Sequence, residues 1–211
     1  MDSINLHCID LSKNYNGKVI FKNVNINLTE KSSLVINGRN GSGKSTLLKV
    51  ISHLIRFDKG NIELNVNGQI IGKEKIYTKI GFLAPYISLY DELTGWENLA
   101  FFYDLKVEQK DKKEEELKYL LEKVGLYKRK NDLIRNYSSG MKQRLKLAFA
   151  IINNPQLLLM DEPRTNLDEE GISVVYNIAE EQKKRGILIL ATNEKEDNEL
   201  CDTSLNIENY K

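Results

Sequence analysis

Cysteine and histidine are scarce in this sequence of 211 residues, which has two of each. Cys8 and Cys201 lie far apart, and neither belongs to a CxxC pair. Free reduced thiols are therefore a better prediction than a disulfide or a metal site. His7 and His53 are isolated from each other, so they indicate no metal cluster either.

The sequence also lacks a charge excess and a long apolar run. It has 31 basic and 30 acidic residues, a formal net charge of +1, so no overall field attracts nucleic acid or an anionic membrane. No signal pattern opens the sequence, and no apolar run approaches the ~20 residues of a membrane span. We expect a soluble chain without a nucleic-acid partner. If it works at a membrane, another chain must hold it there.

A glycine-rich segment at residues 38–46 lies between a predicted strand and a predicted helix. The apolar run at 34–36 predicts a buried strand, and apolar residues at 47, 50, 51 and 54 have the spacing of one helix face. A phosphate-binding loop requires this context, and glycines let successive backbone N–H groups converge on phosphate oxygens. The residues predicted to bind nucleotide are Gly38, Arg39, Asn40, Gly41, Ser42, Gly43, Lys44, Ser45 and Thr46.

Two side chains of this segment have predicted chemical roles. Lys44 places a positive charge near the β and γ phosphates, and the Ser45 hydroxyl is placed to ligate Mg²⁺. The helix is predicted to begin at about Ser45, so its free N–H groups face the same anion. An ordinary Gly/Ser turn is the alternative. The register of the glycines, the lysine and both flanking elements favours binding of a nucleoside triphosphate.

Strand patterns precede and follow this segment. Residues 3–28 contain two half-alternating patterns separated by Asn16-Gly17, which predicts two antiparallel strands, and residues 60–83 predict more strand. Tyr15 stands just before the turn. Its ring could stack on a nucleotide base or only pack the turn, and the spacing leaves both open.

Residues 86–153 have a different character and are predicted to form a helical insertion. Residues 92–126 lack strand alternation, and a solvated one-sided helix explains the charge run between residues 106 and 118. An aromatic group at Trp96 and residues 101–103 forms either the core of this insertion or a surface for a partner. Burial habits favour the core, and the clustering keeps the partner surface open.

A second helix start follows at residues 138–140. Ser138 is a good N-cap, and the small residues Ser139 and Gly140 leave the first N–H groups open to an anion. Capped helices are common, so this pattern alone is weak. Its meaning depends on the residues that follow.

Acidic residues end the next apolar strand, at residues 157–160. Carboxylates at the carboxyl end of a parallel strand lie where open α/β sheets bind ligands. Asp161 is predicted to hold Mg²⁺, and Glu162 to polarise the attacking water. A third apolar strand at 187–191 ends in Thr192-Asn193-Glu194. Three apolar strands joined by helices predict parallel crossovers.

Together these segments resemble the ATP-binding subunit of an ABC transporter over essentially the whole chain. The matching motifs are a Walker A motif GRNGSGKST, a signature YSSGMKQR in place of LSGGQ, a Walker B run LLLMDE and a D-loop TNLD. The resemblance implies an α/β P-loop NTPase fold, with one ABC-type ATPase domain over residues 1–211. Its parts would be a mostly parallel core sheet, an N-terminal antiparallel β subdomain and a helical subdomain inserted at residues 86–153. The signature and the sequence LYDELTGWENLAFF also resemble the small ATPases of simple exporters, among them the haem-exporter ATPase of cytochrome c maturation.

The resemblance also implies ligands and partners. ATP and Mg²⁺ would bind in a head-to-tail dimer, either a homodimer or a pair with another ATPase subunit. The loop of one copy would be closed over by residues 138–140 of the other. Tyr15 falls at the adenine-stacking aromatic, and Glu162, Lys44 and Asn193 are the implied catalytic residues. Integral-membrane transporter subunits would hold the chain at the cytoplasmic face of the membrane.

Three departures from the family pattern predict slow but real hydrolysis. Pro85 aligns with the Q-loop glutamine, Asn193 with the switch histidine and Met141 with the last signature glutamine. A soluble ATP switch with weak turnover is one alternative function, although the retained Asp161 and Glu162 argue against it. A soluble ATPase that remodels nucleic acid or ribosomes is another, and the near-neutral charge and short length argue against that.

Overall fold

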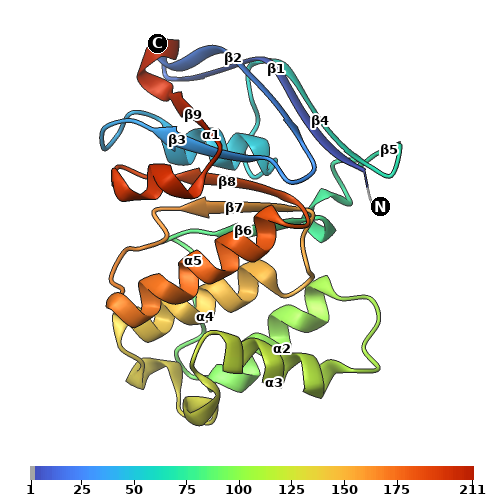
Figure 1. Ribbon diagram of the computed structural model, residues 1–211, viewed down its shortest axis with the longest axis vertical. Helices are drawn as coiled ribbons and strands as arrows, with labels where there is room; N and C mark the ends of the chain where they lie inside the picture. The colour runs from blue at the N-terminus through green and yellow to red at the C-terminus, as the bar shows by residue number, and fades with distance from the viewer. Residues whose placement is uncertain (1–2) are drawn as a thin grey trace.

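The computed structural model describes residues 3–211, which form two β-sheets and a set of helices (Figure 1). The strands are β1 (Ile4–Tyr15), β2 (Lys18–Thr29), β3 (Ser33–Asn37), β4 (Lys59–Val66), β5 (Gln69–Ile70), β6 (Ile80–Leu83), β7 (Leu157–Asp161), β8 (Ile187–Ala191) and β9 (Thr203–Asn206). The α-helices are α1 (Lys44–Ile51), α2 (Gly95–Lys106), α3 (Lys113–Lys123), α4 (Ser139–Ile151) and α5 (Glu169–Lys183). The 3-10 helices are η1 (Ile76–Thr78), η2 (Tyr127–Arg129), η3 (Ile134–Asn136), η4 (Glu196–Leu200) and η5 (Ile207–Tyr210).

The N-terminal sheet is antiparallel, in the order β2-β1-β4-β5. Asn16 and Gly17 both have positive φ, at 48° and 79°, which is the backbone of a two-residue hairpin whose twist matches its strands. Alternate residues of β4 are buried, so one face of this sheet packs on the core. The predicted antiparallel strands are therefore confirmed.

The second sheet is parallel throughout, in the order β6-β7-β8-β3-β9. Every residue of β7 and β8 is buried, as their continuous apolar sequences predict. The predicted parallel crossovers are confirmed. Two strands add to the prediction: β6 joins this sheet rather than the antiparallel one, and β9 forms its other edge.

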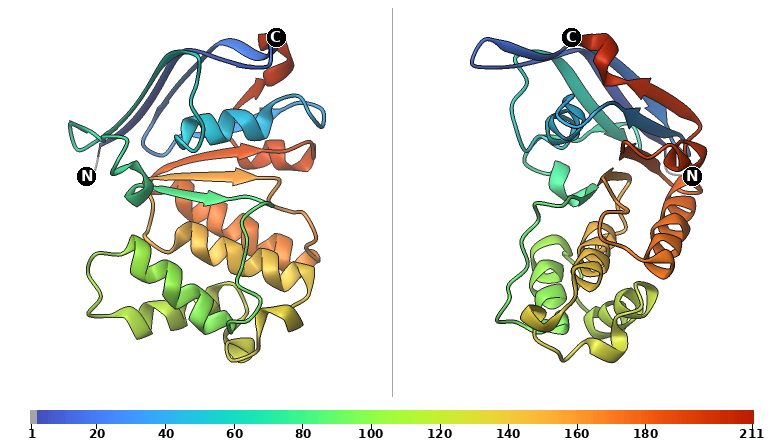
Figure 2. Two further views of the ribbon diagram at one scale, coloured as in Figure 1. Left: turned by 180° about the vertical axis from the view of Figure 1, so that it is seen from behind. Right: turned by 90° about the vertical axis from the view of Figure 1, so that its left-hand side faces the viewer.

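The helices divide between the two faces of the parallel sheet. Helix α1 lies between the two sheets, while α2, α3, α4 and α5 cover the opposite face (Figures 1 and 2). The carboxyl ends of β3, β7 and β8 meet at one edge, on the left in Figure 1, together with the N-termini of α1 and α4. This shared edge places the predicted loop and the predicted acidic residues together.

Two expectations about the helical segments differ from the structure, one for α1 and one for the aromatic group. Leu54 does not belong to the apolar face of α1, because the helix ends at Ile51 and Leu54 is 61 % exposed. In the aromatic group, Tyr103 is fully buried, whereas Phe101 is 41 % exposed. The core interpretation is therefore confirmed for Tyr103, while a partner surface at Phe101 stays a prediction.

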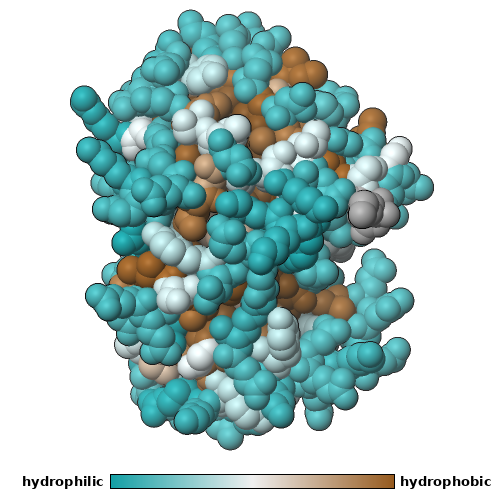
Figure 3. Space-filling view, in the orientation of Figure 1, coloured by the Kyte–Doolittle hydropathy of each residue, from teal (hydrophilic) through white to brown (hydrophobic). Residues whose placement is uncertain are grey.

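Most of the charge run is solvated, but its first residue, Lys106, is not: burial lowers the pKa of its ammonium to about 8, and the ammonium donates to the carbonyl of Ile80 over 3.3 Å. In α3 the glutamates and Lys118 face solvent, while Lys123 is mostly covered and the leucines are buried: Leu117, Leu120 and Leu121. Figure 3 shows a mostly hydrophilic face, with hydrophobic side chains near the top and in a band across the middle. Within residues 3–211, no helix has the length and apolar character needed to cross a membrane.

Candidate functional site

The glycine-rich loop follows β3 and folds tightly against its neighbours. Gly38 has φ 152°, and a Cβ atom there would lie 2.5 Å from Ser42 Oγ. Gly43 caps α1 with φ 114°, and a Cβ atom there would lie 2.7 Å from the Cγ2 atom of Ile20 in the β1–β2 hairpin. Glycine is therefore required at both positions by backbone angle and by space.

Lys44 is the first residue of α1, and its side chain is only 5 % exposed. Its ammonium donates to the carbonyl of Gly38 over 2.8 Å, which ties the two ends of the loop together. The same ammonium lies 3.3 Å from Glu162 Oε1. The loop and the acidic end of β7 are thus joined by one buried cation.

Ser45 and Asp161 meet as the sequence predicts. The Ser45 hydroxyl donates to Asp161 Oδ1 over 3.0 Å, and Asp161 is 1 % exposed at the carboxyl end of β7. Burial raises the pKa of the Asp161 carboxyl, while the Ser45 hydrogen bond and the charges of Lys44 and Lys49 oppose that rise. The positive charges close by therefore favour the ionised form of Asp161.

The donor atoms of this pair suit Mg²⁺. The cation prefers oxygen ligands and is commonly held by one or two protein oxygens together with substrate phosphates. Ser45 and Asp161 provide two such oxygens at the mouth of the loop. Within residues 3–211, no group of three or more His, Cys, Asp or Glu could hold a metal ion without further ligands. The residues present fit a metal shared with a phosphate ligand.

Glu162 extends from the end of β7 in an unusual backbone conformation. Its φ is 47°, and its N–H donates to the carbonyl of Ala191 over 2.8 Å. The backbone N–H of Asn193 donates to its carboxylate, and the side chain is 26 % exposed. Burial raises the pKa of Glu162, and the Lys44 charge opposes this. The carboxylate is therefore fixed, partly open to solvent and suited to accept a proton.

A groove of about 490 Å³ lies beside the loop. Gly38, Arg39, Asn40 and Asn193 line it together, so the predicted switch residue faces the predicted loop. Tyr15 is not among its lining residues; it is 46 % exposed at the end of β1. The contact between the hairpin and Gly43 still keeps Tyr15 in the element that packs on the loop.

Ser138 caps α4 as predicted, accepting a hydrogen bond from the N–H of Met141 over 3.1 Å. Ser138 and Ser139 are exposed. A Cβ atom on Gly140 would lie 2.9 Å from the carbonyl oxygen of Asn166, in the predicted D-loop. Among the described residues, no hydrogen bond or ion pair joins 138–140 to 38–46. Within residues 3–211, the helix start and the loop are therefore not joined by a polar contact.

A buried network behind Glu162 was not predicted. Asp197 in η4 is fully buried, lies 3.5 Å from Arg164 Nη1 and accepts hydrogen bonds from Thr192 and Tyr176. It joins the loop that follows Glu162 to the loop that contains Asn193. Arg164 occurs three residues after Asp161, the acidic end of β7, and that position alone could have suggested a contact.

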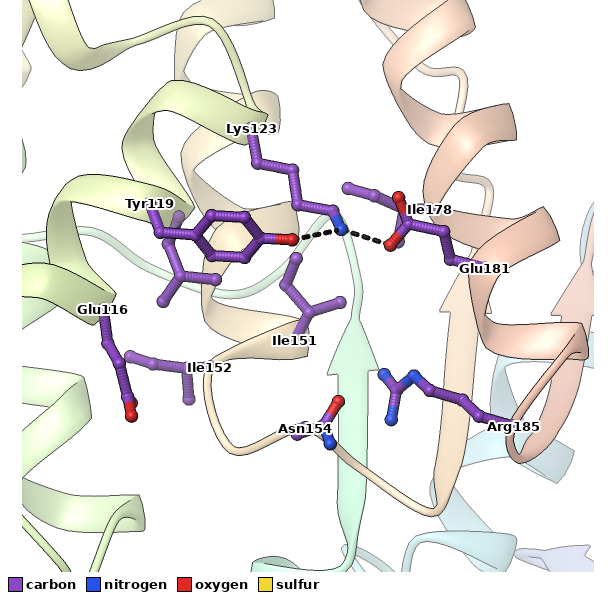
Figure 4. Close-up of a pocket in the computed structure, with 10 residues that line it drawn as sticks. Glu116, Tyr119, Lys123, Ile151, Ile152, Asn154, Ile178, Glu181 and Arg185 are labelled. Atoms are coloured by element: carbon purple, nitrogen blue, oxygen red, sulfur yellow. Dashed lines mark hydrogen bonds and ion pairs between the residues drawn. The ribbon is translucent and has the colours of Figure 1, made fainter.

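A second groove, of about 400 Å³, lies where α3 approaches α4 and α5 (Figure 4). None of the predicted site residues lines it. Lys123 there already bonds Tyr119 and Glu181, and Arg185 donates to the carbonyl of Pro155. Its charged groups therefore serve contacts within the fold.

Comparison with known proteins identifies the family. A family model described as "ABC transporter" matches residues 21–165, more than half of the chain. The Linearmycin resistance ATP-binding protein LnrL of Bacillus subtilis (strain 168) is 36 % identical over 204 residues, covering 93 % of this chain and 64 % of LnrL. The Cytochrome c biogenesis ATP-binding export protein CcmA of Mannheimia succiniciproducens is 31 % identical over 213 residues, covering 100 % of this chain and 98 % of CcmA. The chain belongs to the ABC transporter family, as an ATP-binding protein of that family.

The extent of these matches differs between relatives. The chain spans 64 % of the length of LnrL and of two further Bacillus subtilis relatives. A solved ATP-binding subunit of an ABC transporter superposes with TM-score 0.84 at 28 % identity, covering 97 % of this chain and 87 % of that chain. The ATP-binding cassette MJ0796, solved as a dimer in a post-hydrolysis state with ADP and Pi, shares the fold. It superposes with TM-score 0.83 at 23 % identity, covering 96 % of this chain and 95 % of that chain. The predicted α/β fold and family are confirmed.

Proposed function

We propose that this chain binds and hydrolyses ATP with Mg²⁺ and thereby energises an ABC transporter in the membrane. The observation that supports this most strongly is the meeting of Lys44, Ser45, Asp161 and Glu162 at the mouth of one loop. They provide a cation for phosphate, two oxygens for a metal and a carboxylate for proton transfer.

Each residue has a distinct role in this proposal. The backbone N–H groups of residues 38–46 and the Lys44 ammonium bind the phosphates. Ser45 and Asp161 would hold Mg²⁺, which offsets charge on the γ-phosphate when it is bound. Glu162 accepts a proton from the attacking water. The Asn193 amide donates to the γ-phosphate without the charge that a histidine could add, which slows turnover.

The exposed start of α4 supports a head-to-tail dimer. The start of α4 lies on the same edge as the loop (Figure 1), and within residues 3–211 no hydrogen bond or ion pair joins residues 138–140 to the loop. In a nucleotide-sandwich dimer, the free N–H groups of α4 from one copy would meet ATP bound to the loop of the other. Tyr15 would stack on the adenine at the outer side of the loop. The partner copy is the same chain or a paired ATPase subunit.

An exposed aromatic surface supports a membrane partner. Tyr90 and Phe101 are 50 % and 41 % exposed and meet edge to face at 5.2 Å, and Leu105 nearby on α2 is 59 % exposed. Exposed aromatic groups of this kind mark protein interfaces. Integral-membrane transporter subunits bound here would hold the chain at the cytoplasmic face of the membrane. The transported molecule would be selected by those subunits.

Co-purification tests this proposal directly. The chain is tagged in its native cell, membranes are solubilised in mild detergent, and mass spectrometry identifies what is recovered. A multi-span membrane protein in comparable amount supports the transporter function. Recovery of soluble partners alone, or of none, favours the soluble switch or the remodelling ATPase. Pro85 and Asn193, which depart from the family pattern, would then be the residues to study first.

A further inference from the structure

Asp197 is fully buried in η4, and the proposed function assigns it no role. Its Oδ2 accepts from the Thr192 hydroxyl over 2.8 Å, and its Oδ1 accepts from the Tyr176 hydroxyl over 3.1 Å. Arg164 Nη1 lies 3.5 Å from Oδ1 and supplies the opposite charge. A carboxylate is costly to bury, and these partners offset that cost. Both of its oxygens are therefore held by side chains from other segments of the chain.

The contact with Thr192 closes a short turn around Asn193. Thr192 directly follows β8 and is 1 % exposed. Its hydroxyl donates to Asp197, and the same oxygen accepts from the N–H of Glu194 over 3.0 Å. One hydroxyl therefore fixes the backbone on both sides of Asn193.

The two ends of this turn are also attached to the strand that carries the phosphate loop. The N–H of Thr192 donates to the carbonyl of Ile36 over 3.2 Å, and the Asn37 side-chain amide donates to Asn198 Oδ1 over 2.7 Å. Ile36 and Asn37 are the last residues of β3, directly before the loop. Asn193 lies between these two attachments and lines the groove beside the loop. The turn is thus fixed relative to the place where the phosphates are proposed to bind.

We propose that Asp197 is a positioning residue of the nucleotide site, which holds the Asn193 amide toward the γ-phosphate through the Thr192 hydroxyl. The proposal rests on the proposed function, in which Asn193 donates to that phosphate. An amide has no charge to draw it to the phosphate, so its contribution depends on how well it is held in position. Without the Thr192 hydroxyl, the turn loses its contacts with Asp197 and Glu194 together. A displacement of about 1 Å can cost about 10²-fold in rate.

Two matched variants each remove one hydroxyl from Asp197. Thr192→Val removes the hydroxyl beside Asn193 and keeps a branched side chain, whereas Tyr176→Phe removes the hydroxyl on α5. Steady-state phosphate release gives kcat and KM for ATP. We expect Thr192→Val to lower kcat about 10–100-fold with KM unchanged, because the displaced amide is lost from the transition state. Tyr176→Phe and the conservative Thr192→Ser should keep the wild-type kcat. Thr192→Ala removes the same hydroxyl and takes the place of the valine variant if that variant does not fold.

A double variant tests whether the effect acts through Asn193. Asn193→Ala sets the largest loss in kcat that displacement of its amide can cause. We expect Thr192→Val to lower kcat no further in the Asn193→Ala background, because changes that act through one group are not additive.

The outcomes separate this inference from the function on which it rests. Wild-type protein that releases no phosphate contradicts the proposed function, and wild-type kcat in Asn193→Ala contradicts the role of Asn193 within it. If Asn193→Ala is impaired and Thr192→Val is not, only the role of Asp197 is wrong. Equal losses in Thr192→Val and Tyr176→Phe also overturn that role, because the hydroxyls would then serve the fold alone. Losses that multiply in the double variant overturn it as well, because the effect would not pass through Asn193.

Discussion

Glu162→Gln should separate ATP hydrolysis from ATP binding. The substitution keeps the size of the side chain but removes the carboxylate that accepts a proton, a step worth about 10²–10⁴ in rate. That loss corresponds to about 2.7–5.4 kcal/mol of transition-state stabilisation. In the structure Glu162 also pairs with Lys44 at 3.3 Å, so its removal frees the lysine for phosphate. ATP affinity should therefore be unchanged or higher.

Two assays on the same protein measure this difference. Steady-state phosphate release gives turnover, and equilibrium binding of a fluorescent ATP analogue gives affinity. Glu122→Gln is the control, because it removes the same charge from an exposed i,i+4 pair with Lys118 on α3, away from the loop. Turnover of Glu162→Gln within threefold of the wild type would refute the role of Glu162 as base. A loss of ATP affinity together with the loss of turnover would refute the claim that the substitution separates hydrolysis from binding.

Three further predictions concern pH and stability. Burial raises the pKa of Glu162, so kcat/KM should be retained above that raised pKa and lost as pH falls through it. The acid limb of the phosphate-release profile should therefore lie at higher pH than an ordinary glutamate gives. Asp197→Ala should cost about 1–3 kcal/mol in urea unfolding, because it removes the buried acceptor of the Thr192 and Tyr176 hydroxyls. Leu159→Ala should cost about 2–5 kcal/mol in the same assay, because Leu159 is fully buried in the middle of β7.

The sequence predicted the central strands because their burial on both faces leaves a continuous apolar run. Strands β3, β7 and β8 all follow this rule. Strand β9 does not, because it is an edge strand with one buried residue, Leu205, among polar neighbours. The sequence pattern also could not show which sheet β6 joins, because a run of four residues such as Ile80–Leu83 fits either sheet.

The candidate site was predictable where a motif fixes the chemistry. The sequence brought Ser45 and Asp161 into one predicted metal site, and the structure places them 3.0 Å apart. The ion pair between Lys44 and Glu162 depends on the positive φ of Glu162, which no pattern in the sequence signals. Such contacts arise from packing between distant segments, so local periodicity does not show them.

ATP-dependent dimerisation tests the central claim most directly, because it requires both the loop and residues 138–140. The Glu162→Gln variant is used so that ATP is retained, and light scattering coupled to size exclusion gives the mass with and without ATP and Mg²⁺. The account predicts twice the mass of one chain with ATP and the mass of one chain without it. It also predicts that Ser139→Arg, at an exposed position, abolishes the dimer while ATP still binds. A mass that does not change with ATP would contradict a nucleotide-sandwich dimer of two copies of this chain.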